Sequence, residues 1–210
     1  MLIPEMKTIK NTEIEVFIDN KDGHMIYKIM KIKGVSSCLE YGFSKKPKNK
    51  VFIRRDFGVV GDVHGGRYVR HLYDIRKKGK GAPNIKQVHL IDSEILQTLN
   101  RQGFNVNPGD MGENITTEGV DLMNLPVDTE LQLGQSCVIR LTGARIPCDK
   151  INEFQSGLMY AVIEKPKLKG DKLKFKSGVM GVVIKSGLVR PNDEIIIRNK
   201  REYNSPLPHI

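Results

Sequence analysis

Cys148 is the residue of this sequence whose neighbours are best suited to chemistry. It follows Pro147, which cannot donate a hydrogen bond within a strand, and it precedes a segment with a helical pattern. The amino end of a helix and the nearby cations Arg145 and Lys150 each favour the thiolate form of a cysteine. A thiolate attacks electrophiles or binds soft metals, but a thiol at such a turn can also be a packed structural residue. The spacing alone leaves all three roles open.

The other two cysteines are better explained by structure than by chemistry. Cys137 lies between Leu133 and Leu141 on the apolar face of an alternating run, so we expect a small core residue. Cys38 follows two serines and has no other chemical group near it in the sequence, which favours a structural role. Three cysteines, and no secretory pattern in the first thirty residues, indicate a reducing cytoplasm and no disulfide framework. No apolar run reaches the roughly 18 residues of a membrane span.

The histidines do not form a zinc-binding pattern. His64, His71 and His89 lack paired neighbours of the CxxC or HExxH kind, so we expect surface or supporting roles. His64 is the most suggestive of the three because it lies in the stretch Gly61–Gly66, where glycines let the backbone approach a ligand closely. This stretch does not match the GxGxxG fingerprint of dinucleotide-binding proteins.

Basic residues gather in two parts of the chain and give it a formal net charge of +10. The first group lies in the long segment Arg67–Pro83, for which solvated surface and a site for a phosphate-bearing ligand are both open. The second group alternates with Leu173 and Phe175 and is typical of an exposed edge ribbon. Its members are Lys165, Lys167, Lys169, Lys172, Lys174 and Lys176. Aromatic residues are only 6% of the chain, with no Trp, so a base-stacking surface for nucleic acid is poorly supported.

The elements that must position these residues are mostly short strands. The run Leu131–Leu141 alternates apolar and polar residues, as a half-buried strand does. Near the amino terminus, the apolar runs 13–18 and 25–33 flank a turn rich in Asp, Asn and Gly, which predicts a hairpin. The predicted strands are residues 13–18, 25–33, 51–55, 87–91, 131–141, 179–184 and 194–198. Helices are expected over residues 94–102 and about 152–164. The pattern predicts a mainly β fold, α+β by content, in which short strands form a closed or partly closed β-barrel with about two helices.

Several segments, taken in order, resemble the MOSC domain, which is named after the carboxy-terminal domain of molybdenum cofactor sulfurases. The matching segments are residues 61–64, 87–91, 109–116, 121–122 with 125–126, 133–134, 142–148 and 178–182. The most specific are GENIT at 112–116, TGARIPC at 142–148 and GVMG at 178–181. The resemblance runs from about Lys33 to Arg198. With 210 residues suiting one domain and a small added element, we expect a hairpin extension over 1–30, a MOSC β-barrel over 31–200 and a tail over 201–210.

The resemblance implies a cofactor and an activity. MOSC proteins of known chemistry bind the molybdenum cofactor, a metal held by a phosphate-bearing pterin dithiolene, and a protein cysteine completes the ligand set. By its match to that cysteine, Cys148 is the expected metal ligand and catalytic residue. Related proteins reduce N-hydroxylated compounds, so the resemblance implies an oxidoreductase that acts on N-hydroxylated or N-oxygenated small molecules.

The same resemblance suggests how the rest of the cofactor would be held. Arg145 and the first basic segment, chiefly Arg67 and Arg70, are candidates for binding the pterin phosphate, because Arg forms strong charge-assisted bonds to phosphate. The candidate polar groups around the pterin or the oxo ligand of the metal are Asp62, His64 and Asn114. Glu113 could act in the same way, or it could tie its turn to the barrel.

Two other functions remain open from the sequence. The barrel could be a non-catalytic carrier of sulfur or of the molybdenum cofactor, with a persulfide on Cys148. The positive charge could instead serve RNA, which would require tight and strongly salt-dependent binding. No flavin, haem or iron–sulfur signature occurs in the sequence, so a reductase would need a separate electron-donor protein, and we expect an acidic donor to dock on the basic face.

Overall fold

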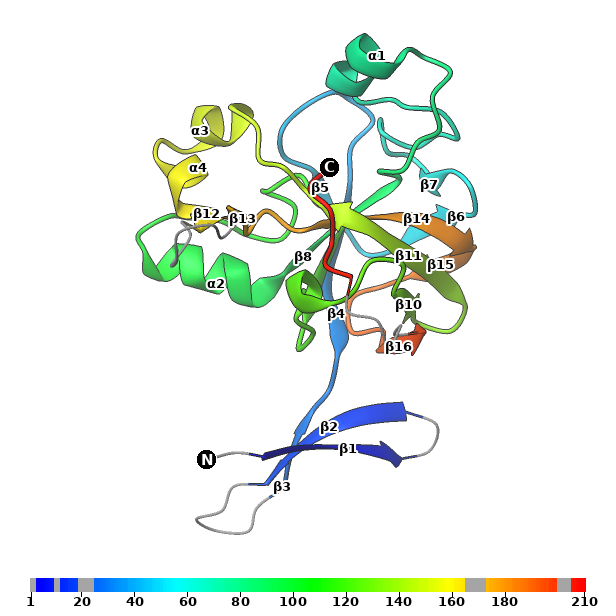
Figure 1. Ribbon diagram of the computed structural model, residues 1–210, viewed down its shortest axis with the longest axis vertical. Coiled ribbons are helices and arrows are strands. Elements are labelled where there is room, and N and C mark those ends of the chain that lie inside the picture. The colour runs from blue at the N-terminus through cyan, green and yellow to red at the C-terminus, as the bar shows by residue number, and fades with distance from the viewer. Residues whose placement is uncertain (1–2, 10–11, 19–24, 165–172, 200–204) are drawn as a thin grey trace.

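The structure is a computed structural model that describes residues 3–9, 12–18, 25–164, 173–199 and 205–210 (Figure 1). Its centre is an eight-stranded sheet in the order β16-β10-β11-β14-β8-β9-β4-β5, in which only β8 and β9 are parallel. The strands are β4 (Lys31–Ser37), β5 (Lys46–Lys48), β8 (Val88–Asp92), β9 (Ile115–Glu118), β10 (Glu130–Leu133), β11 (Cys137–Ala144), β14 (Val179–Lys185) and β16 (Ile195–Asn199). The mainly β prediction is confirmed.

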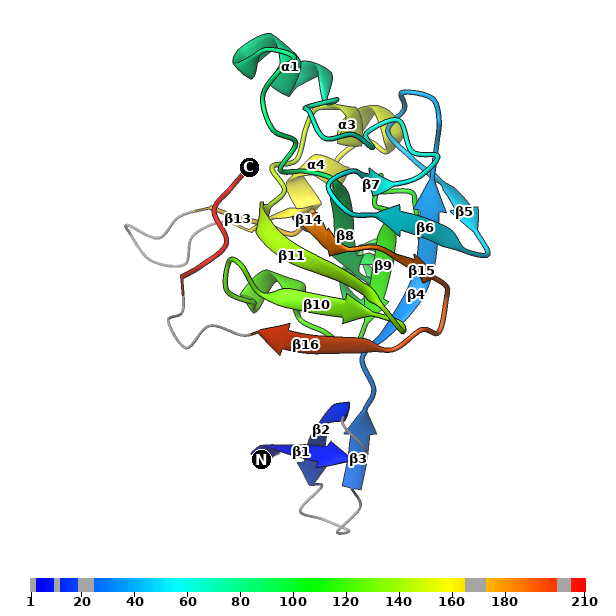
Figure 2. The ribbon, with the colours of Figure 1, turned by 90° about the vertical axis from the view of Figure 1, so that its right-hand side faces the viewer.

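The central sheet curls strongly, and Figure 2 shows β16, β10, β11 and β14 passing in front of β4, β8 and β9. Three backbone hydrogen bonds connect the start of β4 to the chain entering β16, and they run from Ile32 N to Asp193 O, from Asn192 N to Ile32 O and from Ile195 N to Met30 O. The ladder ends there because the chain turns at Pro191, which has no amide hydrogen. The sheet is therefore not closed into a barrel, and this part of the expectation is not met.

Three smaller sheets accompany the central one. The first joins β6 (Val51–Arg54), β7 (Gly58–Val59) and β15 (Gly187–Val189), and the second is the ribbon of β12 (Ile163–Glu164) and β13 (Lys174–Phe175). The third contains β1 (Ile3–Ile9), β2 (Thr12–Ile18) and β3 (Met25–Lys28).

The hairpin predicted near the amino terminus is present as β2 paired with β3, whereas β1 was not predicted. The predicted run 25–33 is divided between β3 and β4, which belong to different sheets. The turn residues 19–24 and the lysines at 165, 167, 169 and 172 lie outside the described residues. The division into 1–30, 31–200 and 201–210 stays an expectation.

The helical predictions succeed once and fail once. The predicted helix 94–102 is present as α2 (Ser93–Arg101), which ends before Gly103 with its positive φ of 95°. The predicted helix 152–164 is wrong, because Gly157 takes a φ of +82° and separates α3 (Lys150–Phe154) from α4 (Leu158–Ala161). The basic segment contains α1 (Leu72–Lys78), which was not predicted, and a 3-10 turn spans Leu122–Asn124. No helix in the described ranges is long and apolar enough to cross a membrane.

Two apolar clusters hold these elements together. The larger lies inside the curled sheet and includes the predicted alternating residues of β10 and β11, which are Leu131, Leu133, Cys137, Ile139 and Leu141. Burial raises the pKa of Cys137 to about 12, so its thiol stays neutral, as expected for a core residue. The second cluster packs α2 against α3 and α4 through Leu96, Leu99, Ile151, Leu158 and Val162. This second cluster fixes the helices that follow Cys148.

Candidate functional site

Cys148 lies in the short connection between β11 and α3, as its sequence neighbours predicted. The preceding residues are held by the sheet, since Arg145 N donates to Gly178 O over 2.9 Å and Ser177 Oγ donates to Arg145 O over 2.5 Å. After the cysteine, Ile151 N donates to the carbonyl of Cys148 over 3.0 Å. Pro147 is buried but Cys148 is exposed. The chain therefore presents this thiol at the surface on a connection fixed at both ends.

Arg145 is the charged residue that belongs with Cys148. Its guanidinium is half-buried, donates from Nη1 to Met111 O over 2.7 Å and lies 5.9 Å from the ring centre of Phe43. Burial lowers the pKa of Arg145, while the negative charges of the Cys148 thiolate and the Glu113 carboxylate oppose that shift. The guanidinium is thus held by a backbone carbonyl and an aromatic ring, within electrostatic reach of the sulfur.

Asp62 is the centre of a buried polar network that does not include Cys148. Its Oδ2 accepts hydrogen bonds from Lys45 Nζ over 2.6 Å and from Asn114 Nδ2 over 3.0 Å, and its Oδ1 accepts the backbone N–H of His64 over 3.0 Å. Burial by itself would raise the pKa of Asp62, but the hydrogen bonds from His64 and the charge of Lys45 outweigh it and lower that pKa. Asp62 therefore stays ionised, and its charge is balanced by Lys45.

The side chain of Asn114 forms three hydrogen bonds within the protein. Besides Asp62, its amide donates to Ser36 O over 3.2 Å, and its carbonyl oxygen accepts the backbone N–H of His89 over 3.2 Å. It thus joins β4, β8 and the Asp62 turn. These bonds use both amide hydrogens of Asn114 and one of the two lone pairs of its oxygen.

Glu113 ties its own turn together, which is the second of the two roles expected for it. Its Oε1 accepts hydrogen bonds from Gly109 N over 2.5 Å and from Thr116 Oγ1 over 2.7 Å. Complete burial raises the pKa of Glu113, and these two bonds only partly oppose the shift. Its second oxygen, Oε2, is buried without a hydrogen-bond partner among the described residues.

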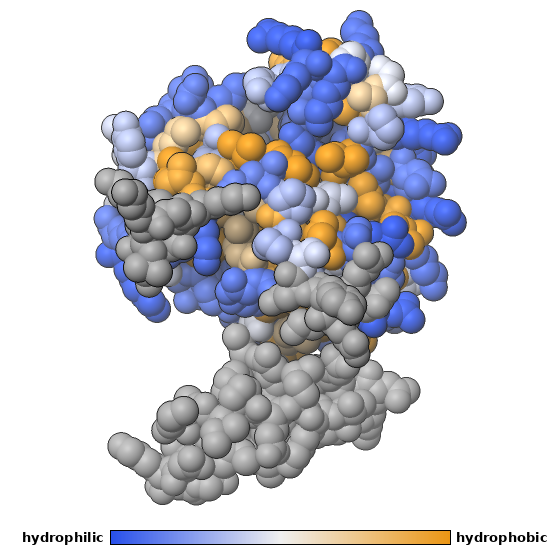
Figure 3. All heavy atoms as spheres, in the orientation of Figure 1, coloured by the Kyte–Doolittle hydropathy of each residue, from blue (hydrophilic) through white to orange (hydrophobic). Residues whose placement is uncertain are grey.

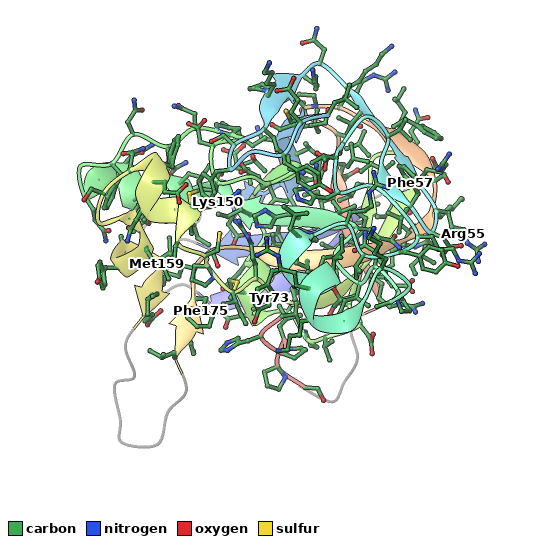
Figure 4. All side chains as sticks on the ribbon, turned by 90° about the horizontal axis from the view of Figure 1, so that it is seen from above. Arg55, Phe57, Tyr73, Lys150, Met159 and Phe175 are labelled. Carbon is green, nitrogen blue, oxygen red and sulfur yellow. The ribbon has the colours of Figure 1, made fainter. Side chains whose placement is uncertain are left out.

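The remaining candidates surround the segment that leads into α1. His64 is half-buried and stacks on His71 with ring centres 4.2 Å apart. The side chains of Arg67 and Arg70 are exposed and form no ion pair within the described residues, while the backbone of Arg70 accepts a hydrogen bond from Tyr41 Oη over 3.1 Å. Figure 4 looks down on α1, marked by Tyr73, with Lys150 of α3 and Met159 of α4 to one side. The two exposed arginines are therefore free to bind an anion.

Comparison with known proteins places the sequence in a family. The family model of the MOSC domain matches residues 61–196, which is more than half of the chain. The chain belongs to the MOSC domain family. This family is associated with binding of the molybdenum cofactor. No curated protein matches the sequence significantly.

Solved structures resemble this MOSC protein in fold. The YuaD protein of Bacillus subtilis superposes with a TM-score of 0.62 and 20% identity, over 79% of this chain and 93% of the other. YiiM of Geobacillus stearothermophilus gives a TM-score of 0.58 and 17% identity, over 84% and 79% of the two chains. YiiM of Escherichia coli gives 0.55 and 16%, over 83% and 73%. At these identities the likeness supports the fold alone.

The buried network around Asp62 contains one charged residue that the sequence does not single out. Lys45 is not among the candidates from the sequence, but its side chain is 6% exposed, burial lowers its pKa, and Asp62 opposes that shift. Nothing in the stretch Lys45–Lys50 distinguishes this lysine from surface lysines, because its ion pair is formed by a residue 17 positions away. His89 is also buried, and its Nε2 contacts Ser177 O over 2.8 Å, so a surface position is excluded.

The donor set of this MOSC domain suits a metal that brings most of its own ligands. Among the described residues, no group of three or more His, Cys, Asp or Glu side chains could hold a metal ion. One exposed thiol beside a fixed guanidinium remains, which fits a soft metal carried by an anionic organic ligand. Cys148 and Arg145 would contact such a cofactor, and Arg67 and Arg70 are available for its phosphate.

Proposed function

We propose that this MOSC protein binds the molybdenum cofactor through Cys148 and reduces N-hydroxylated or N-oxygenated small molecules. The observation that carries the proposal is the pairing of an exposed Cys148 with a fixed Arg145 inside a family associated with this cofactor. A thiolate is a suitable protein ligand for a soft metal, and the cofactor would supply two-electron chemistry at that metal.

The proposed reaction balances with one substrate, two electrons and two protons. The N–O bond of R–NH–OH breaks, the nitrogen is reduced by two electrons and takes one proton, and the oxygen takes the other and leaves as water. The electrons come from a separate donor protein that is itself oxidised.

The protein's own residues supply binding and charge in this proposal. The Arg145 guanidinium stabilises the Cys148 thiolate and the anionic cofactor beside it, and Arg67 and Arg70 bind the pterin phosphate with charge-assisted hydrogen bonds. His64 is placed by Asp62 and by its stack on His71, so it is the candidate group to face the cofactor or substrate. Asn114 acts by holding Asp62 in place.

The electron donor is proposed to dock beside α1. The last turn of this helix carries Arg76, Lys77 and Lys78, and Arg67 and Arg70 precede it. Opposite charges accelerate encounter, and salt screens them. Turnover with an acidic donor is expected to fall as ionic strength rises, and a rate independent of ionic strength would contradict this docking.

Metal analysis tests the proposed function most directly. The protein is produced in a host that synthesises the cofactor, and molybdenum and pterin are measured in the wild type, Cys148→Ala and Cys38→Ala. Near-stoichiometric molybdenum in the wild type and Cys38→Ala, with loss in Cys148→Ala, supports the proposal. Absence of molybdenum from the wild type contradicts it. Reduction of an amidoxime or a hydroxylaminopurine with a chemical reductant then tests the activity.

The exposure of Cys148 also favours a second candidate function, which is sulfur or cofactor transfer. In this function Cys148 takes the outer sulfur of a persulfide on a donor protein and passes it to a thiolate of the acceptor enzyme, so that each transfer breaks one S–S bond and forms another. Mass spectrometry showing a sulfur adduct on Cys148, in protein that does not turn over N-hydroxylated compounds, would favour transfer over reduction.

A further inference from the structure

A cavity lies away from Cys148, and we propose that it binds a small amphipathic organic cation, an amine or amidine with an apolar body. The cavity is a cleft of about 1270 Å³ bounded by α2, the turn 120–124, β13 and residues 206–209. Its lining includes none of the residues of the Cys148 site described above, so the proposal stands independently of the proposed function.

Asp92 forms the polar end of this cleft. It is the last residue of β8, occupies the N-cap position of α2 without a capping hydrogen bond from its side chain, and is only 5% exposed, yet it lines the cavity. Its Oδ1 accepts long hydrogen bonds of 3.3 Å from Thr117 Oγ1 and from Leu122 N. Its Oδ2 accepts no hydrogen bond from the described residues. A buried carboxylate with a free oxygen at a cavity wall is a suitable partner for a cation.

Two more carboxylates lie close enough to act on Asp92. Burial, together with the negative charges of Asp121 and Glu94, which also line the cleft, raises the pKa of Asp92 to about 7. Glu94 accepts the backbone N–H of Gly119 over 2.8 Å, and Asp121 accepts Asn124 Nδ2 over 2.7 Å, so neither forms an ion pair with a described residue. A bound cation would relieve the repulsion among the three acids.

The rest of the cleft is largely apolar. Its walls include Ile95, Leu99, Met123, Phe175 and Leu207, and the ring of Phe175 packs at a tilt of 54° against that of His209, with ring centres 4.7 Å apart. Figure 3, in the orientation of Figure 1, shows apolar side chains gathered across the middle of this face of the molecule, with polar side chains around them. Walls of this kind bury the body of an organic ligand while a few polar groups fix its head.

The identity of the cation follows from the chemistry of the cleft. A metal ion is disfavoured because the described residues contain no group of three His, Cys, Asp or Glu side chains that could hold one. An anion is a real competitor, because Lys174 and Lys176 lie on the β13 side of the cleft. Lys176 is already paired with Glu164 over 3.2 Å, whereas Asp92 at the other end is buried and lines the cavity. An organic cation with an apolar body satisfies both the acids and the walls.

Three probes with the same body and different charge test the proposal. Binding of 2-phenylethylamine, 2-phenylethanol and 3-phenylpropionate to the full chain is measured by NMR titration of labelled protein. We expect the amine to bind about tenfold more tightly than the other two, with shifts centred on Thr98 and Asn124. Equal affinity for the three probes, tighter binding of the anion, or shifts located elsewhere would overturn the proposal.

Variants separate recognition by the acids from nonspecific binding. Asp92→Asn keeps acceptor atoms for Thr117 and Leu122 and should lower affinity for the amine about tenfold, without changing that for the alcohol. Thr98→Lys places a cation at an exposed lining position and should abolish amine binding even if Asp92→Asn fails to fold. Glu153→Gln on α3, outside the cleft, is the matched control and should bind like the wild type. Unchanged amine affinity in a folded Asp92→Asn or in Thr98→Lys would refute the assignment.

Discussion

The Lys45 ammonium lies 2.6 Å from the Asp62 carboxylate, and both side chains are almost completely buried. Removal of one member of such a pair leaves a buried charge without its partner. Lys45→Met is therefore expected to lower the free energy of unfolding by about 3 kcal/mol, measured by urea denaturation. Lys86→Met, which removes a lysine paired with Asp74 of α1, is the control and should cost less, because Asp74 keeps a second cation, Lys78, at 3.8 Å.

The lowered pKa of Asp62 predicts how the stability of the folded protein changes in acid. Because the pKa of Asp62 is lowered below its ordinary value of 3.8, the folded state releases this proton more readily than the unfolded chain. The stabilisation is complete above about pH 4 and is lost as pH falls through the lowered pKa. Asp62→Asn should be less stable at pH 7 but should lose less stability between pH 4 and pH 2. An equal acid dependence in both proteins would contradict the ion pair.

The raised pKa of Asp92 predicts that stability falls as pH rises, which is opposite to the effect of Asp62. Its pKa is about 7 in the folded state against an ordinary 3.8, so the folded state binds this proton more tightly than the unfolded chain. The stability is therefore complete below about pH 4 and is lost as pH rises through 7, by up to about 4 kcal/mol. Asp92→Asn should remove this loss, which urea denaturation between pH 4 and pH 8 will detect. A wild-type stability that does not decline relative to Asp92→Asn over this range would exclude the shift.

The three cysteines should differ in reactivity according to their burial. Cys148 is exposed, Cys38 is intermediate and Cys137 is buried, with its pKa raised to about 12. Treatment of the native protein with iodoacetamide should modify Cys148 first and Cys137 only after unfolding, because the thiolate is the reactive form. Peptide mass spectrometry over time measures the order. Modification of native Cys137 before Cys148 would contradict the structure.

Gly112 and Gly157 allow a matched test of the turn that holds Arg145. Both have positive φ, 78° and 82°, but a side chain at Gly112 would meet the carbonyl of Phe43, whereas Gly157 faces open space. Gly157→Ala should cost about 1 kcal/mol from backbone strain alone. Gly112→Ala should cost clearly more and should displace Met111, whose carbonyl accepts the Arg145 hydrogen bond. Thermal unfolding compares the two, and similar losses would mean that the Phe43 contact yields easily.

Local patterns in the sequence were sufficient for several elements. The alternation over Leu131–Leu141 predicted the buried residues there, including Cys137, but not the turn at Gly134 that divides the predicted strand into the hairpin of β10 and β11. The apolar spacing before Gly103 predicted α2. The change from strand to helix at Cys148 was also predicted, because Pro147 and the following helical pattern are adjacent in the chain. In each case the signal and the structure it specifies lie within about ten residues of one another.

Tertiary structure decided what depends on segments far apart in the chain. The predicted helix 152–164 is divided because Gly157 has a positive φ, which the apolar periodicity of the sequence does not indicate. The curled sheet stops short of a barrel at Pro191. The sequence by itself determined the family, the mainly β character and the position of Cys148. The partners of Asp62, which are 17 and 52 residues away, and the carboxylates of the Asp92 cleft were decided only by folding. Burial and electrostatic pairing act through space, and one linear sequence does not state which distant residues will meet.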